Sequence, residues 1–240
     1  MRIAVVSDIH SNLVALRAVL EDMGTVDAIW CLGDFVGYGP RPNECVALLR
    51  ERGASAIAGN HDLAVVGAIS TDEFNIEAAR AADWTAQELT PESRGFLADL
   101  TPTSTVDGVT LAHGSPREPI WEYVLDSRAA QASFNLLDTK LCFIGHSHIP
   151  SAFVEAPTKI VVKHMTSGSH CEVSEYKMIV NPGSVGQPRD HDPRAAYLIY
   201  DTDAAAMEWR RVPYDIAETQ RQMRKAGLPR YFVERLSFGS

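Results

Sequence analysis

Several side chains that could bind divalent metals follow apolar, strand-like runs in this sequence. Asp34 comes two residues after one such run, residues 28–32, and Gly33 allows a tight turn between them. An isolated Gly-Asp pair is usually only a turn, so the neighbouring motifs decide its interpretation. The other residues placed in this way after apolar runs are Asp8, His10, Asn60, His61, His113, His146 and His148.

Their position after strands indicates that these residues form a metal site. Open α/β sheets bind their ligands at the carboxyl ends of strands. Carboxylates, imidazoles and one amide oxygen that converge there are typical ligands of a pair of divalent cations, and Asp34 is the candidate for the bridge between them. Asp8 and His10 are two residues apart, so an extended backbone would direct both side chains to one face.

Alternating strands and helices over the first 60 residues position the first of these motifs. Residues 2–7 form a continuous apolar strand, as expected for a strand that is covered on both faces. A helix begins at Leu13 and stops at Gly24, and a second helix opens at Pro42 and ends near Gly53. A third strand follows at residues 54–58. This order predicts a parallel sheet with right-handed crossovers.

Residues 62–100 interrupt this order with a helical excursion that is expected to restrict access to the site. One helix is predicted over residues 72–89 and another from Pro91. The Asp107-Gly108 turn then predicts a hairpin, and a helix over residues 126–137 precedes a strand at 141–144.

The rest of the chain is mostly β-structure. Strands are predicted at residues 151–155, 159–164, 177–181, 195–201 and 207–212, before a last helix at 216–225. Because no linker or repeat separates these elements, we expect a single domain over residues 1–240, with the helical excursion inside it. The predicted fold class is α/β, with two packed β-sheets flanked by helices.

The composition is that of an ordinary globular protein and excludes some classes of partner. The net charge of −9 argues against a surface that binds duplex nucleic acid. The four cysteines form no Cys-x-x-Cys pair and are expected to be buried free thiols in a reducing compartment. No apolar run is long enough to cross a membrane, and the first strand begins at Arg2, which leaves no room for a signal peptide. The chain is therefore expected to be cytoplasmic, without a membrane partner.

The ordered set of motifs resembles that of the calcineurin-like metallophosphoesterases. The matching motifs are Asp8-x-His10, Gly33-Asp34, Gly59-Asn60-His61-Asp62, His113-Gly114 and Gly145-His146-x-His148. The glycine-rich run at residues 181–186 is similar to that of the small bacterial and archaeal phosphodiesterase branch. One departure is Ala112, because many relatives have a glycine before this histidine.

The resemblance implies two divalent cations and a catalytic histidine. One cation would be bound by Asp8, His10, Asp34 and His148, and the other by Asp34, Asn60, His113 and His146. Manganese is expected first, while iron, zinc, cobalt and nickel suit the same ligands. Two such metals, about 3.5–4 Å apart, would activate a bridging hydroxide for in-line attack on phosphorus. His61 would protonate the leaving alkoxide or stabilise charge, and Asp62 would either orient His61 or serve as a turn residue.

Substrate contacts are less specific in the sequence. Arg41, Arg117 and Arg189 lie in loops near the motifs and are candidate substrate-binding residues, although each also fits a solvated surface arginine. Tyr38 and Trp121 are candidates to stack against a base or an aryl leaving group. Ser115 lacks the Gly-x-Ser-x-Gly context of a nucleophilic serine.

The favoured function is hydrolysis of a small phosphodiester or nucleotide-type substrate. A phosphomonoesterase, including a protein phosphatase, is the nearest alternative. A non-catalytic metal-binding scaffold is a second alternative, and His61 argues against it because such scaffolds tend to replace this histidine. A nuclease would need a basic groove or a further DNA-binding domain, and the sequence indicates neither.

Overall fold

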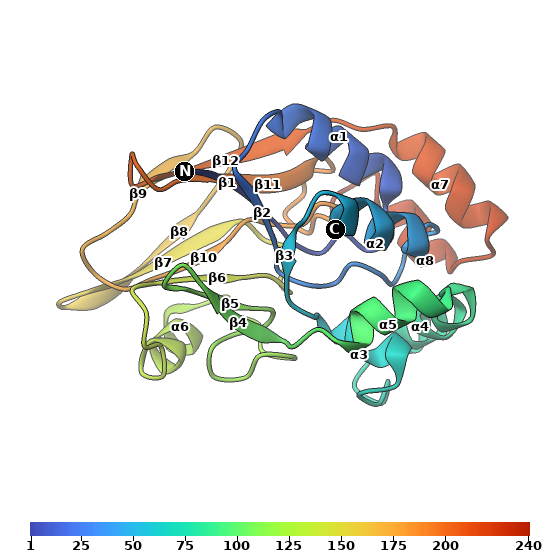
Figure 1. Cartoon of the computed structure of the whole chain (residues 1–240), viewed down its shortest axis with the longest axis horizontal. Helices are drawn as coiled ribbons and strands as arrows, with labels where there is room; N and C mark the ends of the chain where they lie inside the picture. Colours follow the sequence, from blue (N-terminus) through green and yellow to red (C-terminus); the bar gives the residue numbers. More distant parts are fainter.

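The computed structural model describes all of residues 1–240 and arranges them as two six-stranded sheets with helices on the outside (Figure 1). The first sheet consists of β1 (Arg2–Val6), β2 (Ala28–Cys31), β3 (Ser55–Ala56), β9 (His170–Glu172), β11 (Ala195–Asp201) and β12 (Ala206–Val212). The second sheet consists of β4 (Thr103–Val106), β5 (Val109–Ala112), β6 (Leu141–Ile144), β7 (Ser151–Ala156), β8 (Lys159–His164) and β10 (Met178–Asn181). The helices are α1 (Leu13–Met23), α2 (Pro42–Glu51), α3 (Asn60–Val66), α4 (Ile76–Glu88), α5 (Pro91–Ala98), α6 (Ser127–Phe134), α7 (Ile216–Lys225) and α8 (Arg230–Arg235).

Both sheets are mixed. The first has the order β3-β2-β1-β11-β12-β9, in which β1, β2 and β3 run parallel and β11 pairs antiparallel with β1. The second has the order β4-β5-β6-β10-β7-β8, with β5, β6 and β10 parallel. The predicted parallel start of the chain and the predicted hairpin of β4 and β5 are therefore confirmed.

Apolar clusters lie on both faces of the first sheet, and residues of β1 contribute to each of them. Ile3 and Val5 pack in the layer between the sheets, together with Trp30 of β2. Ala4 and Val6 point to the other face and pack in the cluster that contains α1. Because both faces are buried, the strand is apolar throughout rather than alternating.

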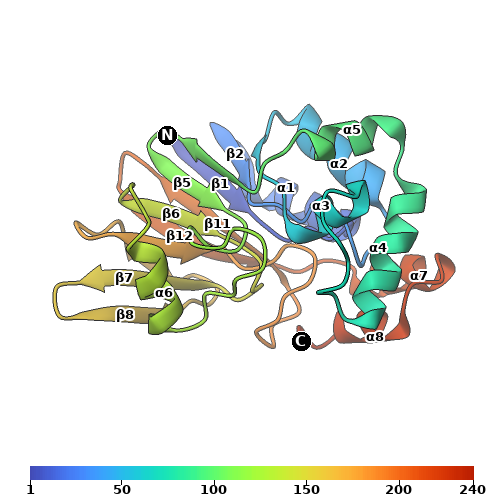
Figure 2. The ribbon, with the colours of Figure 1, turned by 90° about the horizontal axis from the view of Figure 1, so that it is seen from below.

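The helices cover the outer faces of the sheets (Figure 2). Helix α1 packs on β11 and β12 of the first sheet, and α6 packs on β7 and β8 of the second. Helices α4, α7 and α8 share a separate apolar cluster that includes Tyr38, Ala81, Met223 and Phe232. None of the helices combines the length and apolar character needed to span a membrane. All four cysteines are buried and free, as predicted.

The structure corrects several predicted elements. Helix α3 was not expected, and it begins at Asn60, so the Gly-Asn-His-Asp motif forms a helix N-terminus. Seven residues are too few for a clear helical periodicity, and the helix is defined at its ends by Gly59 and Gly67. Helix α4 begins at Ile76 because the Asn75 side chain caps its first turn. The short strand β9 and helix α8 were also not predicted, and β9 exists through pairing with β12.

Candidate metal centre

The predicted metal ligands lie where the carboxyl ends of strands from both sheets meet. Asp8 and Asp34 follow β1 and β2 of the first sheet, whereas His113 and His146 follow β5 and β6 of the second. Backbone and side-chain hydrogen bonds join these ends. The Asp8 N–H donates to the carbonyl of Gly33 at 3.1 Å, and the His146 N–H donates to Asp8 Oδ1 at 3.3 Å. The two-sheet architecture thereby brings together residues that are far apart in the sequence.

The ligand atoms form two buried groups with one shared member. Within each group, these atoms lie within 4.8 Å of one another. The first group is Asp8, His10, Asp34 and His148, and the second is Asp34, His113 and His146. Asn60, expected to complete the second group, places its Oδ1 3.1 Å from His113 Nε2. The structure thus brings all seven predicted ligands into one site, with Asp34 common to both groups.

The hydrogen bonds of the imidazoles leave the first group suited to a cation. A carbonyl can only accept, so His10 Nδ1 donates to Val36 O at 3.1 Å and His148 Nδ1 donates to Gln187 O at 2.5 Å. Each Nε2 therefore carries a lone pair, and the two Nε2 atoms face one another at 3.1 Å. Two facing lone pairs repel, and a divalent cation that accepts both relieves this repulsion. Asp8 Oδ2 is also buried and has no hydrogen-bond partner.

The second group follows the same logic. His113 Nδ1 donates to Leu32 O at 2.8 Å, which leaves a lone pair on the Nε2 atom that faces Asn60 and lies 3.5 Å from Asp34 Oδ2. His146 is turned the other way, because its Nε2 donates to the carbonyl of Trp121 at 3.2 Å and its Nδ1 is left as the ligating atom. Carboxylate, imidazole and amide donors arranged in this way fit divalent transition metals.

Burial sets the protonation states of these groups. Desolvation raises the pKa of Asp8 to about 7 and raises the pKa of Asp34 well above its ordinary value. It lowers the pKa of His10, His146 and His148 well below the ordinary value, so these imidazoles are neutral and can ligate. A bound cation favours the ionised carboxylates, and binding would therefore release protons.

An unusual backbone directs five of the seven side chains to the centre. Ten residues other than glycine have a positive φ, and half of them are predicted ligands. These five are Asp8 (54°), His10 (48°), Asp34 (52°), His146 (64°) and His148 (61°). The expectation of an extended Asp-x-His backbone was therefore wrong. Such left-handed residues are disfavoured by about 1–3 kcal/mol each and tend to gather at functional sites.

His61 lies beside the two ligand groups and belongs to neither. Its backbone N–H donates to Asp34 Oδ1 at 2.9 Å, so the first turn of α3 holds the shared carboxylate. Its ring packs against Tyr38 at 4.3 Å and Phe74 at 4.6 Å between centroids, and its Nδ1 is buried without a partner. Burial lowers the pKa of His61 well below its ordinary value.

The Asp62 carboxylate accepts hydrogen bonds from the backbone and does not orient the His61 ring. Its Oδ1 accepts from the Val36 N–H at 3.2 Å and its Oδ2 accepts from the Gly59 N–H at 3.0 Å. Oδ2 therefore caps the start of α3, and Oδ1 joins this helix to the loop that carries Asp34. Asp62 lies inside α3 and is not a turn residue, and the idea that it orients the His61 ring is also corrected.

A cavity of about 20 Å³ lies at the centre of the site. It is lined by Asp34, Tyr38, Asn60, His61, Tyr123, His146, His148 and Arg189. Tyr123 was not predicted from the sequence. The only feature that could have indicated it is its position two residues after Trp121, in the loop that follows His113.

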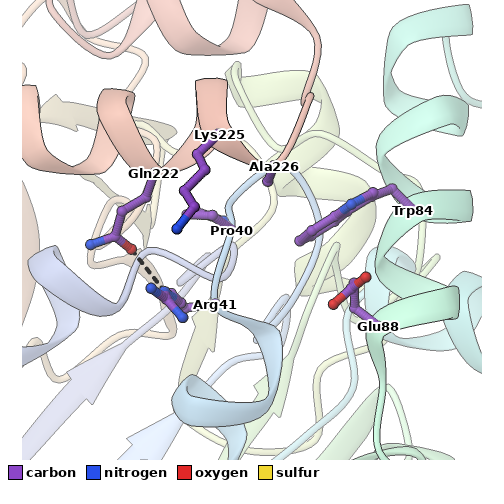
Figure 3. Close-up of a pocket in the computed structure, with 7 residues that line it drawn as sticks. All are labelled: Pro40, Arg41, Trp84, Glu88, Gln222, Lys225 and Ala226. Carbon is purple, nitrogen blue, oxygen red and sulfur yellow. Dashed lines mark hydrogen bonds between the residues drawn. The ribbon is translucent and has the colours of Figure 1, made fainter.

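Of the three candidate arginines, only Arg189 lines this cavity, and its Nε is buried without a hydrogen-bond partner. Arg41 instead donates to Gln222 Oε1 at 2.9 Å in a surface hollow beside Trp84 (Figure 3). Arg117 pairs with Glu122. The structure therefore directs Arg41 and Arg117 away from the cavity that both were expected to serve.

Comparisons with known proteins identify the family. Residues 1–205 match the family described as the calcineurin-like phosphoesterase superfamily domain. An uncharacterized protein of Methanocaldococcus jannaschii is 42% identical over 244 residues, which cover 99% of this chain and 98% of that protein. The crystal structure of a metallophosphoesterase from Sphaerobacter thermophilus is 49% identical with a TM-score of 0.92 and covers 100% of this chain and 99% of its own.

A shorter match is to a protein named symmetrical bis(5'-nucleosyl)-tetraphosphatase from Thioalkalivibrio sulfidiphilus. It is 37% identical over 68 residues, which cover 26% of this chain and 25% of that protein. The predicted resemblance and the predicted fold class are both confirmed. The chain therefore belongs to the calcineurin-like phosphoesterase superfamily, a family of metal-dependent hydrolases of phosphoric esters.

Proposed function

We propose that this hydrolase acts on a phosphodiester or nucleotide-type substrate at a centre of two divalent cations. The observation that carries the proposal is that the two ligand groups share Asp34. One carboxylate common to two sites is the arrangement that holds two cations close together. One cation would be held by Asp8, His10, Asp34 and His148, and the other by Asp34, Asn60, His113 and His146.

The chain's own residues supply the rest of the chemistry. When bound, the cation pair clamps the phosphoryl oxygens and activates water for in-line attack. His61 lines the same cavity and would protonate the leaving alkoxide or stabilise the charge that develops on the phosphoryl group. Its low pKa in the folded protein does not exclude this role, because an anionic substrate close to the ring favours the imidazolium form.

Arg189 is the residue proposed to bind a phosphoryl oxygen. Its Nε is buried and has no acceptor in the protein, and a buried guanidinium N–H without an acceptor is well suited to an anion. Arg189 and His61 line the same cavity. A substrate oxygen bound there would receive a charge-assisted hydrogen bond.

The class of substrate is supported by similarity and by the surrounding rings. The name of the tetraphosphatase relative states that it acts on bis(5'-nucleosyl) tetraphosphates, which favours a nucleotide-type substrate here. Tyr38 lines the cavity, and Trp121 packs against Phe74 at 5.3 Å beside His61. Such rings can stack on a base or an aryl group.

The test is a substrate panel with the metal-stripped protein reloaded with one metal at a time. The panel contains bis(4-nitrophenyl) phosphate, 4-nitrophenyl phosphate and a dinucleoside tetraphosphate. We expect two ions per chain, the highest rate with manganese, and faster hydrolysis of the diester or the nucleotide than of the monoester. A preference for the monoester would favour a phosphomonoesterase. An absence of hydrolysis with every metal would leave the scaffold as the better explanation.

A further inference from the structure

The central cavity is too small for the proposed substrate. Its volume of about 20 Å³ is close to the roughly 10–15 Å³ that one water molecule needs. A phosphoryl group has several heavy atoms and is larger than one water molecule, so it does not fit in such a space. Access therefore requires that a side chain in the cavity wall moves.

Exposure identifies the part of the wall that can move. Six of the eight lining residues are buried, whereas Arg189 is partly buried and Tyr123 is 46% exposed. Tyr123 lies on the irregular segment between β5 and α6, and its ring stacks on the His146 ring at 4.1 Å and 23°. The ring thus covers a predicted ligand on one side and contacts solvent on the other.

The backbone around Tyr123 is fixed, so the side chain is the mobile element. The Glu122 carboxylate accepts from the Ser115 hydroxyl and from Arg117, and the Trp121 carbonyl accepts from His146. These contacts attach the segment to the site and to itself. Exposed side chains change rotamer within picoseconds to nanoseconds, so Tyr123 can turn outward without a backbone movement.

Tyr123 shares the cavity wall with the arginine that is proposed to bind a phosphoryl oxygen. Both residues line the cavity, and the Arg189 Nε is buried without a partner. A phosphoryl oxygen that reaches this Nε must enter the cavity, and the Tyr123 ring lies at its exposed side.

We propose that Tyr123 is the specificity-determining residue of this site, a gate whose ring closes the cavity until a phosphoryl group enters it. The proposal rests on the proposed function. With Tyr123 turned outward, the phosphoryl group reaches Arg189 and the predicted ligands. The substituents on phosphorus then lie where the ring was, so the size of the Tyr123 side chain limits the size of the ester.

The first experiment measures inorganic phosphate binding to the manganese-loaded full chain by calorimetry, which needs no turnover. Tyr123→Ala removes the ring that closes the cavity, so we expect phosphate to bind about 3- to 10-fold more tightly, the range set by loss of one ring stack. Leu125→Ala, which changes an exposed side chain of the same segment, should bind phosphate like the wild type. Equal or weaker binding by Tyr123→Ala would overturn the proposal.

The second experiment compares two diesters with the same leaving group, methyl 4-nitrophenyl phosphate and bis(4-nitrophenyl) phosphate. Tyr123→Ala should raise kcat/KM for the bulky ester relative to the small one by about 3- to 10-fold, the range set by loss of one ring stack. Tyr123→Trp should shift the ratio the other way, and this variant provides the test if the alanine variant fails to fold. Leu125→Ala, an exposed residue of the same segment, is the control and should leave the ratio unchanged. A ratio that does not respond to either Tyr123 variant would refute the gate, whereas an inactive wild type would refute only the proposed function.

Discussion

Replacement of His61 by asparagine tests the proposed chemistry most directly. The change removes the proton donor and keeps the backbone N–H that donates to Asp34 Oδ1 at 2.9 Å. His61 belongs to neither ligand group, so both cations should stay bound. A general acid or a positioned charge contributes about 10²–10⁴-fold in rate, which corresponds to about 2.7–5.4 kcal/mol of activation free energy. We therefore expect kcat to fall by that factor with little change in metal content.

The assay compares two leaving groups. If His61 protonates the leaving oxygen, a nitrophenyl ester should lose less rate than an alkyl ester, because nitrophenolate leaves without a proton. Equal losses would favour stabilisation of phosphoryl charge. His164→Asn, an exposed histidine outside the site, is the matched control and should keep the wild-type rate. No loss on any substrate, with both metals bound, would remove His61 from catalysis and favour the non-catalytic scaffold.

Four further predictions follow from the structure. Asp34→Asn should weaken both cations at once, and two ions per chain retained after dialysis together with full activity would contradict the bridge. Phe74→Ala removes the ring that packs on Trp121, so bulky esters should be hydrolysed faster relative to small ones while the metal content stays constant. Unchanged ratios of these rates would argue against the prediction that residues 62–100 restrict access to the site. Gly59→Ala would place a Cβ in collision with Asp34 Oδ1, so we expect loss of metal and about 1–3 kcal/mol of stability in chemical denaturation. Gly95→Ala has no atom within 4 Å of its new Cβ and should instead stabilise α5 by about 0.5–1 kcal/mol.

Local signals in the sequence determined most of the elements. The continuous apolar run of β1, the stop of α1 at Gly24, the Asp107-Gly108 turn and the start of α5 at Pro91 all act within a few residues. Such signals depend on backbone conformation and nearby side chains, and they were predicted well. The ordered motifs at strand ends also predicted which residues gather at the site, because strands of one direction place their carboxyl ends at one edge.

Only the tertiary structure decided how these residues meet and which others join them. Arg41 and Arg189 look alike in the sequence, yet Arg189 lines the cavity and Arg41 pairs with Gln222 in a surface hollow. From the sequence, Asp62 could orient a ring or form a turn, whereas in the fold it caps α3 and accepts from the Val36 N–H, 26 residues away. Tyr123 became part of the wall only because its segment is attached to a histidine of another strand end. These roles depend on contacts between distant parts of the chain, and the local sequence does not specify such contacts because their energy comes from packing of the whole fold.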